Sequence, residues 1–319
     1  MRRVLSSLAR LLGRRATAAS RRNPDCSVYA LALRDRQAVP GTLRVLSPAG
    51  SFSQPMISHC GARVTMWGTS DEADGSHIWV AALDGTSAAR RVTADPGTQG
   101  HPYWHPDGRR LLHFASPSGR WEPQRQFAAD RPPSQLRWVD VDSGESTPLT
   151  HGSWTDERPA VAPDGKTVVF VSNRSGYLNL WIVDADGGGL SRLTEGPGPD
   201  YRPCISPDGS RLAFFSPTVD GAHQVRLVSL ATGEDIACDW TQRFAWTHGP
   251  YWYPDGRSLL VHGLERGATR PALWQVDLAE GQVHRVETPG LASASHGTVD
   301  HAERWLVFDS RDTPTRSGH

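Results

Sequence analysis

Short apolar stretches recur along the chain, and tight turns separate them. Four copies share the order short strand, Pro-Asp-Gly turn and apolar strand, at 101–116, 158–194, 202–216 and 250–263. The turn aspartates are Asp107, Asp164, Asp208 and Asp255, so successive turns lie 57, 44 and 47 residues apart. A period of about 40–50 residues built from four short strands predicts the blades of a β-propeller.

Incomplete copies stand at the two ends of this array. Residues 27–47 predict two strands like the second half of a copy, and residues 296–312 supply only an inner pair. Residues 54–70 form a degenerate copy with His59-Cys60-Gly61 in place of Pro-Asp-Gly. We therefore expect an all-β propeller, six four-stranded blades, with the last blade closed by N- and C-terminal strands, which removes open sheet edges. Seven blades stay an alternative if residues 117–134 or the N-terminal region hold another.

Composition agrees with many short strands and excludes some partners. The 319 residues include 31 Gly, 24 Pro and 12 Trp, which suits tight turns and packed aromatic strands. The 34 basic and 34 acidic side chains balance, so no global field favours nucleic acid. No run of about 18 apolar residues predicts a membrane span. None of the four cysteines forms a C-x-x-C pair, and we expect a monomer.

The first 24 residues contain seven Arg and no acid, with Leu and Val along one helical face. This pattern is typical of an organellar transit peptide, but a disordered basic tail and a secretory signal stay open. The expected division is a basic extension at 1–26, one propeller at 27–312 and a tail at 313–319. A transit peptide would place the protein in a mitochondrion or another organelle. Without a transit peptide, we expect the protein in the cytoplasm, and a periplasmic location is less favoured.

The Pro-Asp-Gly turns also indicate which residues surround the channel. Each turn joins the two innermost strands at one face, so the residue entering the innermost strand lies at the opposite channel mouth. These six residues are all polar, and three are histidines. They are Gln54, His101, Arg158, Arg202, His248 and His296. Two interpretations stay open, namely hydrogen bonding to a neighbouring blade or a ligand site. As a metal site, the three imidazoles would hold Mn or Zn with an open position.

A long loop at 116–135 is expected on the same face as this ring. It carries Arg120, Trp121 and Arg125. Arginine pairs bidentately with carboxylates, and tryptophan stacks on sugars or peptide side chains. We predict that these side chains contact a ligand, and a disordered surface insertion is the alternative.

The repeat RPAVAPDGKTVVFVSNRSGYLNLWIVDADGGGLSRLT at 158–194 resembles the TolB-type, WD-repeat-like propeller repeat. The resemblance extends over roughly residues 27–312 and implies the propeller fold. TolB has an α/β domain before its propeller, where this chain has about 26 residues. Prolyl oligopeptidase relatives also carry propellers, but the chain contains no G-x-S-x-G motif, so we do not expect a serine peptidase.

Three blade entries resemble those of the oligogalacturonate lyases, which are manganese-binding propellers. They are THGPYWYPDG, SHGTVDHAERWLVF and HPYWHPDGRRLLHFAS. This resemblance implies His248, His296 and His101 as metal ligands, with Gln54 as a looser match. The metal would acidify the C5 proton of a uronate, and a base such as His151 or His59 would remove it. No residue is assigned a catalytic role from a motif.

Two functions follow from these observations. The favoured hypothesis is a non-catalytic module that binds a protein, peptide or glycan at the channel mouth, because the repeat carries no appended catalytic domain. The alternative is a metal-dependent lyase acting on acidic oligosaccharides. No cofactor is expected beyond a divalent metal, Mn or Zn.

Overall fold

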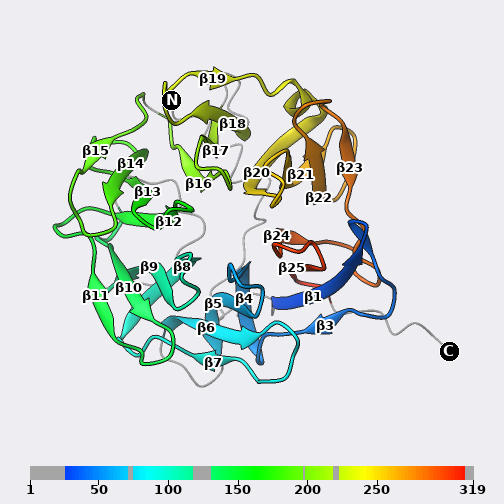
Figure 1. Ribbon diagram of the computed structural model, residues 1–319, viewed down its shortest axis with the longest axis horizontal. Helices are drawn as coiled ribbons and strands as arrows, with labels where there is room; N and C mark the ends of the chain where they lie inside the picture. Colours follow the sequence, from blue (N-terminus) through cyan, green and yellow to red (C-terminus); the bar gives the residue numbers. More distant parts are fainter. Residues whose placement is uncertain (1–25, 71–74, 118–130, 197, 218–222, 313–319) are drawn as a thin grey trace, which may run out of the picture.

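The computed structural model describes residues 26–70, 75–117, 131–196, 198–217 and 223–312. The chain is an all-β propeller, as predicted, with sheets arranged around a central axis (Figure 1). The innermost strands of the sheets are β4 (Gly50–Ile57), β8 (Gly97–Trp104), β12 (Asp156–Val161), β16 (Tyr201–Ile205), β20 (Phe244–Trp252) and β24 (Ser295–Val299). Their antiparallel partners are β5 (Arg63–Ser70), β9 (Arg110–Ser116), β13 (Thr167–Ser172), β17 (Arg211–Pro217), β21 (Ser258–Glu265) and β25 (Trp305–Ser310).

The outer strands complete each unit. The third strands are β6 (Gly75–Ala82), β10 (Gln135–Asp140), β14 (Asn179–Asp184), β18 (His223–Ser229), β22 (Ala272–Asp277) and β1 (Ser27–Arg34). The short rim strands are β7 (Arg90–Arg91), β11 (Ser146–Pro148), β15 (Ser191–Arg192), β19 (Asp235–Ile236), β23 (Val283–Arg285), β3 (Arg44–Val45) and β2 (Gln37–Ala38). A 3-10 helix, η2 (Asp239–Arg243), precedes β20. A two-residue parallel pairing of β6 with β8 joins two units into one sheet.

Two segments far apart in the sequence share one sheet. Strand β1 pairs with β25 from Ser27 opposite Ser310 to Ala32 opposite Trp305. Figure 1 shows these blue and red strands side by side. Strand β24 then continues the sheet toward the axis, and β3 pairs with the other edge of β1.

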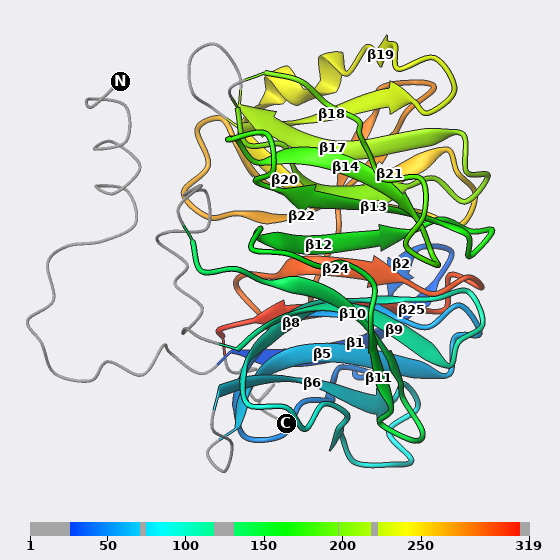
Figure 2. The same ribbon diagram turned by 90° about the vertical axis from the view of Figure 1, so that its left-hand side faces the viewer.

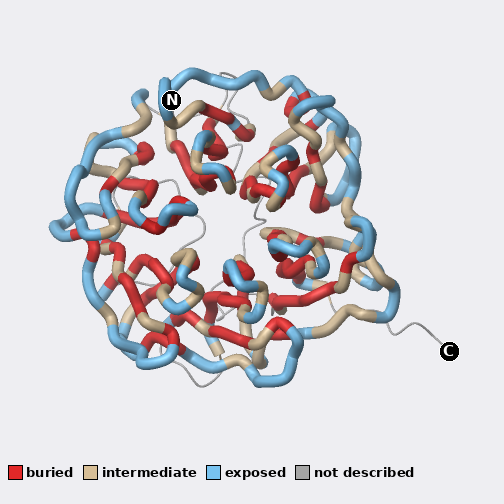
Figure 3. The backbone as a smooth tube through the Cα atoms, in the orientation of Figure 1, coloured by how far each residue is buried: buried red, intermediate tan, exposed pale blue. Residues whose placement is uncertain are grey.

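The hydrophobic core lies between neighbouring sheets. One cluster joins Val169 and Leu180 of β13 and β14 to Phe214 of β17, and the equivalent clusters repeat around the ring. Figure 3 shows buried residues within the sheets and exposed residues along the outer rim. Tryptophans also bond across the sheets, since the Trp104 indole donates to the Met56 carbonyl at 3.0 Å. Burial of these aromatic faces is the main favourable term in holding one sheet against the next.

Several predicted features lie outside the described residues. These are the basic N-terminal segment, the C-terminal tail at 313–319, and the loop side chains Arg120, Trp121 and Arg125. In the described part of the chain, no helix has the length and apolar character needed to cross a membrane.

Candidate functional site

Every innermost strand carries a bulge at the same place. The register between the first and second strands shifts in all six units, leaving two residues of the inner strand unpaired. The first unpaired residue has a positive φ in each. These residues are Gln54 (54°), His101 (50°), Arg158 (49°), Arg202 (53°), Gly249 (61°) and His296 (49°). A proline follows in five of the six units, where no ladder hydrogen bond is needed.

This geometry corrects one member of the predicted ring. The equivalent residue in β20 is Gly249, and His248 lies one position earlier, opposite His262. The ring residue stands six positions before the turn aspartate in the regular copies, and six before Asp255 is Gly249. In the sequence Thr-His-Gly-Pro, a polar residue directly precedes the glycine, and the prediction assigned His248 to the ring instead of Gly249.

Non-glycine residues in the left-handed conformation are destabilising by roughly 1 kcal/mol or more each. Five of the bulges nevertheless have a non-glycine residue with positive φ at this position. The bulge turns the side chain away from the sheet, and four of these residues line one pocket at the end of the channel. They are Gln54, His101, Arg158 and Arg202. Strain repeated at one functional edge of a scaffold is the kind of outlier from which a binding role is inferred.

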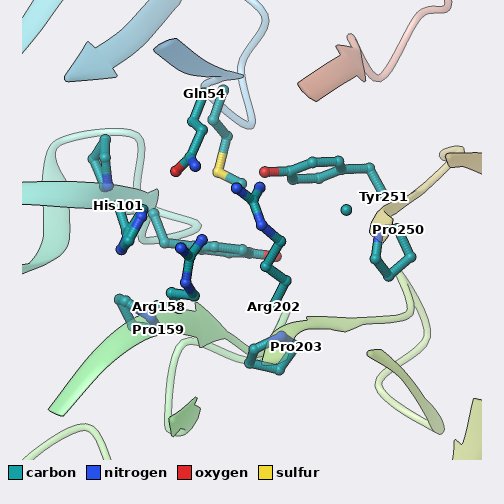
Figure 4. Close-up of a pocket in the computed structure, with 12 residues that line it drawn as sticks. Gln54, His101, Arg158, Pro159, Arg202, Pro203, Pro250 and Tyr251 are labelled. Atoms are coloured by element: carbon teal, nitrogen blue, oxygen red, sulfur yellow. The ribbon is translucent and has the colours of Figure 1, made fainter. Parts of the chain in front are cut away.

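The pocket is small and receives polar groups mainly from side chains (Figure 4). Its volume is ≈ 40 Å³, which is room for a few waters at about 10–15 Å³ each, or for one carboxylate. Four prolines in its wall have no N–H to donate, and they are Pro102, Pro159, Pro203 and Pro250. Met56, Tyr103, Gly249 and Tyr251 also line the pocket.

Arg202 is the least compensated charge in this pocket. Figure 4 shows its guanidinium in the middle of the pocket, between Gln54 and Tyr251. Among the described residues, no hydrogen bond or ion pair reaches this guanidinium. Burial and the neighbouring Arg158 charge lower the pKa of Arg202 to about 9, so the group is still protonated at neutral pH. This partly exposed cation can therefore bond to an acceptor that enters the pocket.

Arg158 stands beside Arg202 and approaches a carboxylate that a second arginine also binds. Its guanidinium lies over the Tyr201 ring at 4.4 Å, and its Nε is 3.9 Å from Glu157 Oε1. That carboxylate is already bound by Arg131, at 2.9 Å and 2.5 Å, and accepts a hydrogen bond from the Tyr201 hydroxyl. One carboxylate therefore faces two guanidinium groups, and Arg202 adds a third cation without an acid.

His101 is held in an aromatic environment. Its ring centroid lies 5.1 Å from that of Trp67 and 5.1 Å from that of Phe114. Gln54 accepts a hydrogen bond from the Trp67 indole at 3.1 Å. Burial, followed by the charges of Arg158 and Arg202, holds the pKa of His101 well below its ordinary value. His101 is therefore neutral near pH 7 and adds no positive charge to the pocket.

A second group of imidazoles lies next to the pocket on β20, β21 and β24. His248 Nε2 and His262 Nδ1 are 3.3 Å apart, and the His248 ring stacks on Trp246 at 5.0 Å. The ring centroids of His262 and His296 are 6.0 Å apart. Burial and the His296 charge lower the pKa of His262 to about 3. The sequence interpretation missed His262, although its position across from His248 follows from the β20–β21 hairpin.

His296 has a carboxylate partner that sequence reasoning also missed. Its Nδ1 lies 2.8 Å from Asp309 Oδ2, which also accepts from Ser53 Oγ at 2.5 Å and the Gln54 N–H at 2.8 Å. Despite burial, the His296 charge and these hydrogen bonds hold the pKa of Asp309 well below its ordinary range. The Asp309 carboxylate thus bonds to both the bulge of β24, through His296, and the bulge of β4, through the Gln54 N–H. No motif marks Asp309, because its role arises only when β25 meets the neighbouring sheet.

The predicted metal set does not assemble. His101 lies among Trp67 and Phe114, whereas His248 and His296 are stacked with centroids 5.8 Å apart. Over the described ranges, no group of three or more His, Cys, Asp or Glu side chains could hold a metal ion. The residues therefore do not fit the manganese centre that the lyase resemblance implies, and no chemical step is derived through one.

Comparisons with known proteins agree with the fold. A family model of the dipeptidyl peptidase IV N-terminal region matches residues 74–220. An uncharacterized protein of Agrobacterium fabrum (strain C58) is 32% identical over 84 residues, which cover 25% of this chain and 24% of that relative. The matched part thus spans about a quarter of the relative's length.

Two solved structures resemble the whole propeller. A TolB-like protein from Agrobacterium tumefaciens superposes with a TM-score of 0.65 and 17% identity, covering 89% of this chain and 97% of that one. An oligogalacturonate lyase in complex with manganese has a TM-score of 0.55 and 14% identity, covering 78% and 68%. At these identities the likeness is one of fold, and the fold is the TolB-type propeller predicted from the repeats.

Proposed function

We propose that this propeller is a binding module whose partner inserts a carboxylate into the channel-mouth pocket. One observation carries the proposal, namely the protonated Arg202 guanidinium that has no acceptor among the described residues. Arg158 lies beside it, and Glu157 is shared with Arg131. A carboxylate would supply the missing charge and accept two parallel N–H bonds from one guanidinium.

The size of the pocket limits what enters it. A volume of ≈ 40 Å³ admits an end group but no sugar ring or large side chain. The rest of the partner therefore lies above the mouth, over the loops of the same face. A chain that presents a carboxylate at its tip or along its length fits this arrangement, and both acidic peptides and uronate oligosaccharides qualify.

Binding fits the site better than the lyase alternative does. The imidazoles that the lyase resemblance assigns to a metal lie in two separate environments. A lyase would also need a base next to the sugar, whereas His101 and His248 pack against aromatic rings and His296 is paired with Asp309. The resemblance to TolB-like structures favours a partner that is a protein, and this part of the proposal rests on likeness of fold alone.

The test uses probes that differ only in charge. Trigalacturonate and its methyl ester form one pair, and a short peptide with a free or amidated C-terminus forms the other. We expect calorimetric binding of the charged member of at least one pair, and a loss of tenfold or more in Arg202→Gln. Arg257→Gln, an exposed arginine at the opposite face, is the matched control. Equal binding of ester and acid, or an unchanged Arg202→Gln, would refute the carboxylate pocket.

A further inference from the structure

The opposite end of the channel holds a larger cavity with a different lining. Its volume is ≈ 170 Å³, and Met56, Tyr103 and Tyr251 belong to its wall as well as to the upper pocket. The turn prolines of four units line it, and they are Pro106, Pro163, Pro207 and Pro254. In the other two units the equivalent turn positions are His59 and His301, which line the same cavity.

The two imidazoles lie side by side because their turns belong to neighbouring sheets. His301 Nε2 and His59 Nδ1 are 2.9 Å apart, and the ring centroids are 4.0 Å apart at an interplanar angle of 64°. At this distance one ring donates its N–H and the other accepts, so the pair shares one proton. Partial burial, followed by the His59 charge, lowers the pKa of His301. A ring nitrogen that faces another imidazole in this way has a lone pair that a metal ion could accept.

A buried carboxylate stands next to the pair. The Asp300 side chain is 1% exposed, and its Oδ1 accepts the N–H groups of Arg304 and Trp305 at 2.6 and 2.7 Å. Its Oδ2 has no hydrogen-bond partner in the part of the chain that is described. A Cβ placed on Gly61 would lie 3.6 Å from this oxygen, so Oδ2 faces the turn that carries His59.

The cation nearest to this carboxylate compensates it weakly. Arg304 Nε lies 3.6 Å from Oδ2, but its side chain is 67% exposed. Water screens such a pair strongly, so the buried oxygen keeps most of its negative potential. Two adjacent imidazoles therefore place ligand nitrogens beside a buried, incompletely compensated carboxylate, and this combination suits a divalent cation.

We propose that the His59–His301 pair binds a borderline divalent metal ion such as Zn²⁺ at the lower mouth of the channel. Tetrahedral zinc with bonds of about 2.0–2.1 Å places two ligand nitrogens roughly 3.3 Å apart, which needs only a small widening of the pair. The ring that donates must change tautomer when the metal binds: it loses the proton between the rings to solvent and takes one up at its other nitrogen, so both imidazoles stay neutral ligands and no net proton is released. Because the described residues provide no third ligating side chain in place, water completes the coordination, and Asp300 contributes charge.

Calorimetry with Zn²⁺ alone tests this site. The full chain, free of affinity tags and treated with a chelator, is titrated with zinc chloride near pH 7.5. We expect one equivalent to bind, with affinity reduced at least tenfold in His59→Ala and in His301→Ala. Cys60→Ser and His284→Ala are the controls. Cys60 adjoins His59 but its Sγ bonds Ser58 Oγ at 3.4 Å, and His284 is exposed on a rim strand.

A second readout protects the test against misfolded variants. His59→Gln keeps a polar side chain of similar size, and Co²⁺ reports its own ligands by visible absorption. The absorption bands of bound Co²⁺ should weaken or shift in His59→Gln while circular dichroism is unchanged. Unaltered cobalt spectra in this variant would overturn the proposal. So would a zinc affinity that is lost in His262→Ala but kept in His59→Ala, because the metal would then lie at the upper mouth.

Discussion

Replacing Arg202 by Gln should stabilise the fold while it weakens binding of the proposed anionic partner at least tenfold. In the free protein the guanidinium is half-buried beside Arg158 and has no acceptor among the described residues. Such a charge opposes folding, and the neutral amide removes this penalty. The bulge itself accepts glutamine, since Gln54 has the same backbone conformation at the equivalent position.

The size of the effect follows from the proton affinity of the group. A fall of the Arg202 pKa from its ordinary value to about 9 means that folding weakens proton binding by more than three factors of ten. At about 1.4 kcal/mol per factor of ten, this limits the penalty to roughly 5 kcal/mol. Partial access to the pocket screens the charge, and the substitution also removes the contacts of the arginine stem. We therefore expect a net gain of about 1–2 kcal/mol.

Chemical unfolding at several pH values measures this gain. Between about pH 9 and the higher pKa of the unfolded chain, the native state binds fewer protons, so the Arg202 penalty declines as pH rises. The stability difference between Arg202→Gln and the wild type should be constant from pH 6 to 8 and should shrink above pH 9. Comparing the two proteins cancels the titration of the tyrosines. A less stable variant, or a difference independent of pH up to 10, would refute an uncompensated charge at this position.

Three further substitutions test the network around the pocket. Glu157→Gln should destabilise the fold by about 3–5 kcal/mol in urea unfolding, because the bidentate partner of the buried Arg131 is neutralised; a loss under 1 kcal/mol would contradict a buried pair. Asp309→Asn should cost about 2–3 kcal/mol at pH 7, and this deficit should shrink as pH falls below about 4, because the low native pKa of Asp309 stabilises the fold only where the unfolded carboxyl is ionised. Gly249→Asn should cost no more than about 1 kcal/mol, since a Cβ there meets nothing closer than 3.8 Å, whereas Gly50→Ala should cost on the order of 3 kcal/mol because its Cβ would lie 2.2 Å from a carbonyl oxygen. Similar melting temperatures for the two variants would contradict the expectation that the bulge position Gly249 accepts a side chain whereas the closely packed Gly50 does not.

The repeat was sufficient to predict the fold because its information is local. A Pro-Asp-Gly turn between two apolar strands specifies a hairpin wherever it occurs, and its period specifies the architecture. The ring was predictable for the same reason, since a fixed offset from the turn locates Arg158 and Arg202. The same offset from Asp255 gives Gly249, and the prediction of His248 was wrong because a polar residue was chosen in place of that count.

The rest of the site depends on contacts between sheets. Asp309 meets the bulge of β4 only because β25 belongs to the adjacent unit, and the His59–His301 pair forms across the same boundary. Neither partner can be identified from spacing, because the residues are about 250 positions apart. The balance of charges around the pocket could not be predicted from the sequence either. Glu157 is committed to Arg131, and Arg202 is left without an acid, only after the sheets have packed.

The pairing of β1 with β25 sets an order of events during synthesis. Ser27 to Ala32 are translated well before their partners at 305–310. Until then, β1 has an unsatisfied edge, and Asp309 is not available to hold the bulges of β4 and β24. The bulge that carries Gln54 therefore lacks its Asp309 partner until β25 has been made. A nascent propeller arrested before Trp305 would expose unpaired strand edges to chaperones and proteases, so translation of β25 precedes completion of this sheet.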